Sequence, residues 1–349
     1  MKGQFIALLF ASVSFVDAKA QVSVFNPAVT ADGVNYILPK TQLQVKVSAI
    51  KTVFVPGEYA RYADRYLRLS DARSDAETSW RITSVTARTV GEPDTLKRYT
   101  VKVKDKNLLP KVQLTRSGLM MAINTNAHEP LADFDVEPDY STDHRLDYRK
   151  YYNEEMLSAT SSSKLAELMA QEILDIRDSK NQIKRGQVES MPKDGESFHI
   201  CLDALDLQEE ALMQAFVGYT DTLYCERVYA ITPDKDIDKE VLLRFSKKLG
   251  YVDADDLSGE PVYVSITDKH TVTLPTEKEA AKRKLTGLVY NVPSMADVQV
   301  FSGSGNYFSG EMPFAQYGTV DVLGPTLFGK DVTTKVVFDT ATGGVKVIE

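Results

Sequence analysis

Leu43-Gln44-Val45-Lys46-Val47 is the stretch that decides the fold. Apolar and polar side chains alternate along it, and a period of two is typical of a β-strand with one buried face. The same period recurs in residues 99–103, and residues 119–123 form an apolar run typical of a fully buried strand. The sequence therefore predicts an N-terminal β domain, which we bound at residues 21–127.

A second β-rich region closes the chain. Clusters of Gly, Pro and Asp separate short strand-like segments there, as in other β proteins. The predicted strands are residues 222–231, 241–245, 262–266, 271–274, 288–292, 298–301 and 332–338, and residues 345–348 complete a final hairpin. We assign residues 221–349 to a C-terminal β domain.

Between these two regions the spacing of the apolar residues changes. Acidic residues and two prolines crowd residues 129–147 without an apolar repeat, which indicates a loop or linker. Apolar residues then recur at helical spacing, with Ser163 as a possible N-cap and Gly186 as a stop. A second helix runs from near Asp194 to Gly218. The predicted fold class is α+β, predominantly β, with two β domains separated by an inserted acidic linker and α-hairpin at residues 128–220.

The two β regions share a short motif. Gly33, Tyr36 and Pro39 have the same spacing as Gly287, Tyr290 and Pro293. The segment 59–63 follows the first motif at nearly the distance at which 314–318 follows the second. Either these residues recur by chance at strand edges, or the two β regions arose by duplication.

The first twenty residues resemble a cleavable signal peptide. Lys2 precedes an apolar run, residues 5–16, that is too short to span a bilayer, and Ala18-Lys19-Ala20 supplies a small-x-small cleavage site. We therefore predict export of a chain that begins at Gln21, into the periplasm, to the outer membrane or outside the cell. No later segment reaches the roughly 20 consecutive apolar residues of a membrane helix. The net charge of −8 disfavours nucleic acid as a partner.

Three groups of residues are candidates for a site or a crosslink. Cys201 and Cys225 are the only cysteines, and they either pair as a disulfide or remain as inert thiols. Tyr59, Tyr62 and Tyr66 fall on one side of a short predicted helix, where they either seal the core or form a binding stripe for a sugar or a protein. The acidic residues of 129–147 either bind calcium or form a solvated linker.

Motifs of known chemistry are missing or incomplete. His128-Glu129 begins a zinc peptidase motif, but Ala132 stands where the second histidine is needed. Ser304 between two glycines has the wrong spacing for a nucleophile elbow, and neither type of phosphate-binding glycine loop occurs. The sequence nominates no catalytic, cofactor-binding or metal-binding residue.

Four ordered segments resemble a known family. They are residues 36–41, 56–63, 243–246 and 287–293. In these segments the chain is similar to an exported Bacteroidota family, the domain of unknown function 4831. The resemblance implies a Gram-negative envelope setting and supplies no site residue, because the family has no established activity.

These observations favour an exported, non-catalytic protein of the cell envelope that binds another protein or a glycan. A hydrolase of envelope glycan or peptide is the first alternative, because it needs only two suitably spaced carboxylates. A self-assembling structural component of the envelope is the second, and exposed edge strands would favour it.

Overall fold

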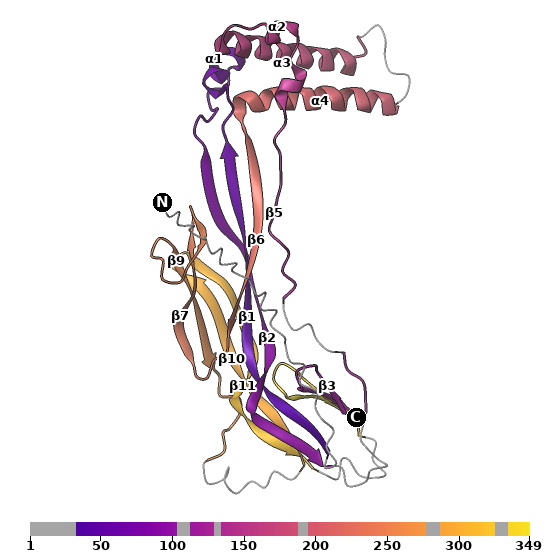
Figure 1. The fold of residues 1–349 in the computed structure, drawn as a ribbon, viewed down its shortest axis with the longest axis vertical. Helices are drawn as coiled ribbons and strands as arrows, with labels where there is room; N and C mark the ends of the chain where they lie inside the picture. Colours follow the sequence, from indigo (N-terminus) through magenta and orange to yellow (C-terminus); the bar gives the residue numbers. More distant parts are fainter. Residues whose placement is uncertain (1–32, 103–111, 129–133, 188–194, 277–286, 325–333) are drawn as a thin grey trace, which may run out of the picture.

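The computed structural model describes residues 33–102, 112–128, 134–187, 195–276, 287–324 and 334–349. The predicted signal peptide, residues 1–20, lies outside these ranges. The described chain forms antiparallel sheets and a small group of helices (Figure 1), which confirms the α+β, predominantly β fold class. None of its described helices is long and apolar enough to cross a membrane.

Three sheets are present in the described part of the chain. The first has the strand order β2-β1-β6-β5, and comprises β1 (Gly33–Val55), β2 (Glu77–Lys102), β5 (Tyr140–Ser141) and β6 (Tyr219–Ile231). The second has the order β11-β10-β9-β7-β8, and comprises β7 (Ile237–Ser246), β8 (Gly250–Val252), β9 (Glu260–Asp268), β10 (Leu288–Ser302) and β11 (Gly305–Leu323). The third has the order β13-β12-β4-β3, and comprises β3 (Val112–Leu114), β4 (Met120–Ile123), β12 (Val336–Phe338) and β13 (Val345–Ile348).

A narrow β arm projects from the body formed by these sheets. It consists of the far ends of β1, β2 and β6, and it carries all the labelled helices at its tip (Figure 1). β1 pairs with β6 up to its last residue, Val55 opposite Tyr219, so the arm is hydrogen-bonded along its whole length. The 23 residues of β1 span about 75 Å at about 3.3 Å per residue.

We call the helices at the tip the head. They are η1 (Ala60–Tyr62), α1 (Ala63–Leu67), η2 (Tyr148–Tyr151), α2 (Glu154–Leu157), α3 (Ser162–Lys184) and α4 (Gly195–Val217). The predicted α-hairpin is α3 with α4, and Gly186 and Gly218 follow the two helices with positive φ, as predicted. The N-cap of α3 is Ser161 rather than Ser163, because the Ser161 hydroxyl accepts the backbone N–H of Lys164 at 3.2 Å.

The two predicted β regions share one hydrophobic core. Leu43, Val45 and Val47 are fully buried, as their alternation predicts. They lie in the same hydrophobic core as Val264 and Phe314, from the C-terminal region. β4 also pairs with β12, so the third sheet joins two N-terminal strands, β3 and β4, to two C-terminal strands, β12 and β13. The division at residues 127 and 221 stays a prediction. The shared core could not be predicted, because alternation shows which side chains are buried and not what covers them.

Most predicted C-terminal strands are present. Residues 288–292 and 298–301 belong to one continuous strand, β10, while residues 271–274 form no strand. The final hairpin is confirmed, since β12 pairs with β13.

The two long hairpins share one irregularity. Between the pairs Ile37–Arg98 and Pro39–Pro93, one residue of β1 lies opposite four residues of β2. Between Val292–Thr319 and Ser294–Phe314, one residue of β10 again lies opposite four of β11. Both bulges fall at the proline ends of the matched motifs, at Leu38 beside Pro39 and at Pro293, so this part of the internal similarity has a structural counterpart.

The second part of the similarity has none. Residues 60–62 form η1 in the head, whereas residues 314–318 lie within β11 in the body. The correspondence between the two β regions is therefore limited to the hairpins and their bulges.

Tyr36 joins the two hairpins. Its side chain is 1% exposed, and its hydroxyl both donates to Val289 O and accepts from Val289 N, each at 2.9 Å. Asn291 also connects the two hairpins, because its Nδ2 donates to Pro39 O at 3.1 Å.

We expect Tyr36→Phe to destabilise the body by about 2–4 kcal/mol. The change leaves a buried N–H and a buried C=O of Val289 without the partner they have now, at about 1–3 kcal/mol each. Tyr290, the matched position in the second hairpin, is only partly buried, so Tyr290→Phe should cost below about 1 kcal/mol. Urea denaturation of both variants tests this, and equal costs would contradict a bridging role for the Tyr36 hydroxyl.

Candidate functional site

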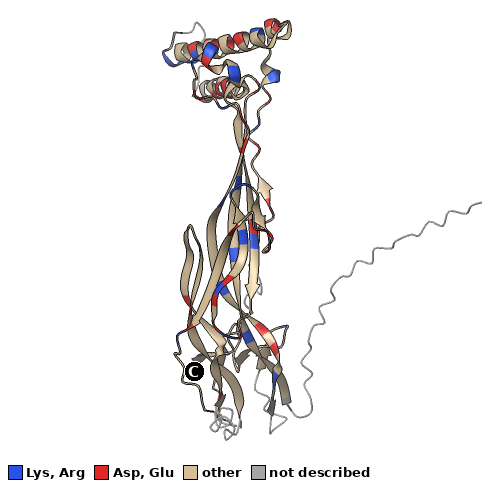
Figure 2. Ribbon diagram, turned by 90° about the vertical axis from the view of Figure 1, so that its left-hand side faces the viewer, with Lys and Arg blue, Asp and Glu red and all other residues tan. Residues whose placement is uncertain are grey.

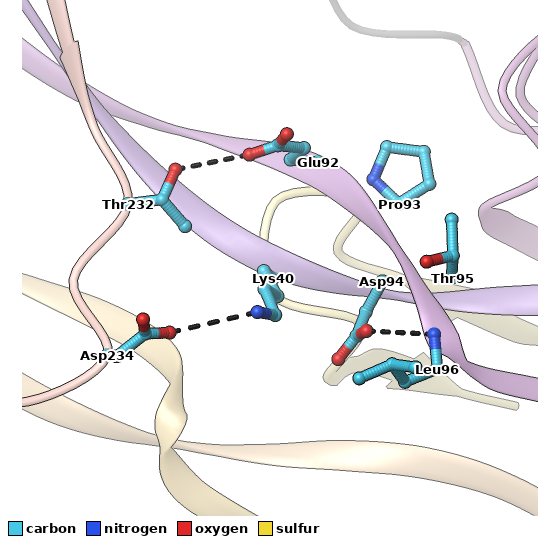
Figure 3. Close-up of a pocket in the computed structure, with 8 residues that line it drawn as sticks. All are labelled: Lys40, Glu92, Pro93, Asp94, Thr95, Leu96, Thr232 and Asp234. Atoms are coloured by element: carbon cyan, nitrogen blue, oxygen red, sulfur yellow. Dashed lines mark hydrogen bonds and ion pairs between the residues drawn. The ribbon is translucent and has the colours of Figure 1, made fainter.

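An open polar pocket lies beside the bulge of β2. The four-residue excursion 94–97 lifts this strand away from β1, and the connection after β6 forms the facing wall (Figure 3). The volume is about 530 Å³. It is lined by Lys40, Glu92, Pro93, Asp94, Thr95, Leu96, Thr232 and Asp234.

Two polar contacts cross this pocket, and a third lies within its β2 wall. Lys40 Nζ lies 3.7 Å from an Asp234 carboxylate oxygen. The Thr232 hydroxyl donates to Glu92 at 3.1 Å, and the Leu96 backbone N–H donates to Asp94, also at 3.1 Å (Figure 3). The Leu96 side chain is 89% exposed at the rim. Carboxylates, hydroxyls and one ammonium suit a polar, hydroxyl-rich ligand better than an apolar one.

A Ser, an Asp and a His also meet at the end of β9. The Ser294 hydroxyl donates to Asp268 Oδ1 at 2.7 Å, and His270 Nδ1 lies 2.8 Å from Asp268 Oδ2. Burial acts to raise the pKa of Asp268, but the hydrogen bonds from Ser294 and the His270 backbone and the nearby His270 charge outweigh it, so the pKa is lowered. In a catalytic triad the serine hydroxyl bonds to the histidine. Here both bond to the same carboxylate, an arrangement that fixes the turn between β9 and the following chain.

Tyr59, Tyr62 and Tyr66 do not form an exposed stripe. Tyr59 is 6% exposed and belongs to the head core, with its ring centroid 6.3 Å from that of Phe216. Tyr62 and Tyr66 are half-buried against the same core, and their hydroxyls lie within hydrogen-bond distance of Ser162 and Ser163 on α3. The rings therefore hold residues 59–66 on α3, which is the core role considered from the sequence.

The described part of the acidic segment is a strap that runs from the body to the head. We define the strap as residues 134–147, and Figure 1 shows it beside β6. Polar contacts hold it: Arg227 donates to both carboxylate oxygens of Asp139 at 2.9 Å, and His144 N donates to Asp221 at 2.8 Å. The Tyr140 ring stacks on Tyr224 at 4.7 Å. Within the described residues no group of His, Cys, Asp or Glu is placed to hold a metal ion.

The ion pair of the strap predicts a pH dependence. The hydrogen bond from Arg227 is the largest cause that lowers the pKa of Asp139 below its usual range. A carboxylate with a lowered pKa stabilises the fold above about pH 4 and loses that contribution as the pH falls through the lowered value.

We therefore expect Asp139→Asn to cost about 0.5–1 kcal/mol at pH 7, the range for a solvent-exposed bidentate pair. Wild type and variant should converge once Asp139 is protonated, below its lowered pKa. Paired urea titrations between pH 7 and pH 2.5 measure the difference, and a difference that persists at pH 2.5 would contradict the assignment.

The cysteines are not bonded to each other. Cys201 lies on α4 and Cys225 on β6, and both thiols are free. α4 extends about 24 Å from Cys201 to its end at Val217, at about 1.5 Å per residue, and it leaves the arm sideways (Figure 1). A disulfide needs Cα atoms within about 7 Å, so this geometry excludes it. Burial raises the pKa of the Cys225 thiol, which favours the inert form.

Comparison with known proteins gives one match. No curated protein and no solved structure is similar to the chain. A family model matches residues 32–346, so it covers both hairpins, the arm and the head. This result confirms the resemblance seen in the four sequence segments. The chain belongs to the family described as a domain of unknown function, DUF4831.

Proposed function

We propose that this protein is exported and acts in the cell envelope as a non-catalytic binding protein whose partner is a protein or a glycan. The observation that carries the proposal is the head, which is held away from the body by the β arm (Figure 1). Continuous strands with hydrogen-bonded neighbours make the arm a stiff spacer. A spacer of this kind presents a surface at a distance, which suits recognition.

The charge distribution supports the same role. The head taken as a whole and the arm both carry Lys and Arg as well as Asp and Glu (Figure 2). Mixed charges of this kind suit a surface that selects a partner by complementarity. The export half of the proposal rests on Lys2, the apolar run 5–16 and Ala18-Lys19-Ala20.

Crosslinking in cells tests the binding role. A tagged copy at native level is treated with an amine-reactive crosslinker, and the material that co-purifies is identified by mass spectrometry. We expect one reproducible partner in near-equal amount, linked through head lysines such as Lys164 and Lys184 rather than through Lys247 and Lys248 of the body. Recovery of the protein alone would contradict the proposal. Terminal sequencing of the same material should find Gln21 first.

A carboxylate-dependent hydrolase is the second candidate. The pocket at the β2 bulge favours it, because Glu92, Asp94 and Asp234 converge there with Lys40. Turnover of envelope glycans or peptides by the wild type, and its loss in Glu92→Gln, would support this function over binding alone.

A further inference from the structure

Among the described residues, one face of α4 is covered near the arm and uncovered farther out. Ala211 and Ala215 are buried, and the backbone N–H of Tyr59 donates to Ala215 O at 2.8 Å, so residues 57–60 cover the helix there. Ile200, Ala204 and Leu207 continue the same face at spacings of four and three residues. They are exposed, Ile200 at 63% and Leu207 at 46%. We call these three residues the α4 stripe.

A row of carboxylates borders the α4 stripe. Glu196, Asp203 and Glu210 are spaced by seven residues, which aligns them along one side of the helix. α4 contains five acidic residues and no Lys or Arg.

The other two acidic residues of α4 are already paired. Asp206 and Glu209 form ion pairs with Lys180 and Arg177 of α3. Among the described residues, no cation lies within ion-pair distance of the bordering row. Within the described residues, the carboxylates that flank the stripe therefore have no ion-pair partner.

We propose that the α4 stripe docks a basic amphipathic helix of a partner protein. An apolar stripe with a flanking row of like charge is complementary to a helix that has apolar residues at i, i+3, i+4 and i+7 and Lys or Arg beside them. A second copy is a poorer occupant, because α4 of that copy brings no cation to the row. The proposal rests on the proposed binding function and specifies its surface and the class of its partner.

Three synthetic peptides test the chemistry. The probe is an 18-residue Leu/Lys peptide with leucines at helical spacing, and its controls are a scrambled Leu/Lys peptide and a Leu/Glu peptide of the same pattern. Fluorescence anisotropy is measured with the chain that begins at Gln21, in 0.15 M salt. The patterned Leu/Lys peptide should bind at least tenfold more tightly than either control. Equal binding of the scrambled peptide would overturn the proposal.

Variants locate the contact. Ile200→Ser and Leu207→Ser should each weaken binding of the patterned peptide about tenfold. Both positions are exposed, so both variants keep the fold. The double variant Asp203→Asn, Glu210→Gln should weaken binding of the patterned peptide several-fold and reduce the salt dependence of that binding. Leu174→Ser is the matched control, because Leu174 is 46% exposed on α3 outside the stripe, and it should have no effect. Unchanged binding in the stripe variants would refute the assignment.

Three further outcomes separate the hypotheses. A dimer in sedimentation that Leu207→Ser abolishes would identify a second copy as the occupant and overturn the proposal. In the crosslinking experiment, a partner captured equally by wild type and Leu207→Ser would leave the proposed function standing and the α4 stripe refuted. Absence of any partner from wild type would instead contradict the proposed function.

Discussion

Gly218→Ala should destabilise the protein by more than about 4 kcal/mol, an exceptional cost for one methyl group. Gly218 lies between α4 and β6 with φ of +75°, where a side chain costs about 1–2 kcal/mol from backbone strain alone. A Cβ there would also lie 2.1 Å from Val55 O and 3.0 Å from Gly57 N. Both neighbours are backbone atoms, one in the last residue of β1 and one two residues beyond it, so the clash is relieved only if the head shifts relative to the arm.

Gly186→Ala is the matched control for this change. Gly186 follows α3 with φ of +69°, but a Cβ there meets nothing within 4 Å. We expect it to cost only the strain, about 1–2 kcal/mol. Urea denaturation followed by circular dichroism measures both variants. Similar losses of unfolding free energy in the two variants would show that the close approach to Val55 does not fix the position of the head on the arm.

Local elements could be predicted from the sequence because their causes are local. Leu43, Val45 and Val47 alternate because one face of β1 is buried, and the glycines that end α3 and α4 are needed for a positive φ. The length of the strands could not be predicted. Pro39 and Pro93 suggest breaks, yet they lie opposite each other at the bulge, so β1 and β2 continue through them.

The sites were harder to predict than the elements. The strap has no apolar period, since Asp139, His144 and their polar partners hold it instead. The α4 stripe could not be predicted for a different reason. Ile200 and Leu207 are typical core residues by type. They become candidates for recognition only because no segment among the described residues covers them at the far end of α4. Such an arrangement depends on tertiary structure, which periodicity does not describe.

Because the two β regions share one core, we expect a second substitution to have a large effect on stability. Phe314 is fully buried in β11 among residues that include Val45 and Val47 of β1. Phe314→Ala should cost about 3–5 kcal/mol, the range for removing a buried ring. Because the core is shared, amide exchange should accelerate at Val45 and Val47 together with β10 and β11.

Phe216→Ala is the matched change in the other core. Phe216 is also fully buried, but it packs in the head with Tyr59 and Leu212. It should cost a similar 3–5 kcal/mol within the head, and its exchange effects should concentrate in α3 and α4. Two independent β domains would behave differently, since Phe314→Ala would then leave exchange at Val45 unchanged. Exchange that accelerates at Val45 in Phe314→Ala and much less in Phe216→Ala would show that the molecule divides between body and head, and not between its N-terminal and C-terminal β regions.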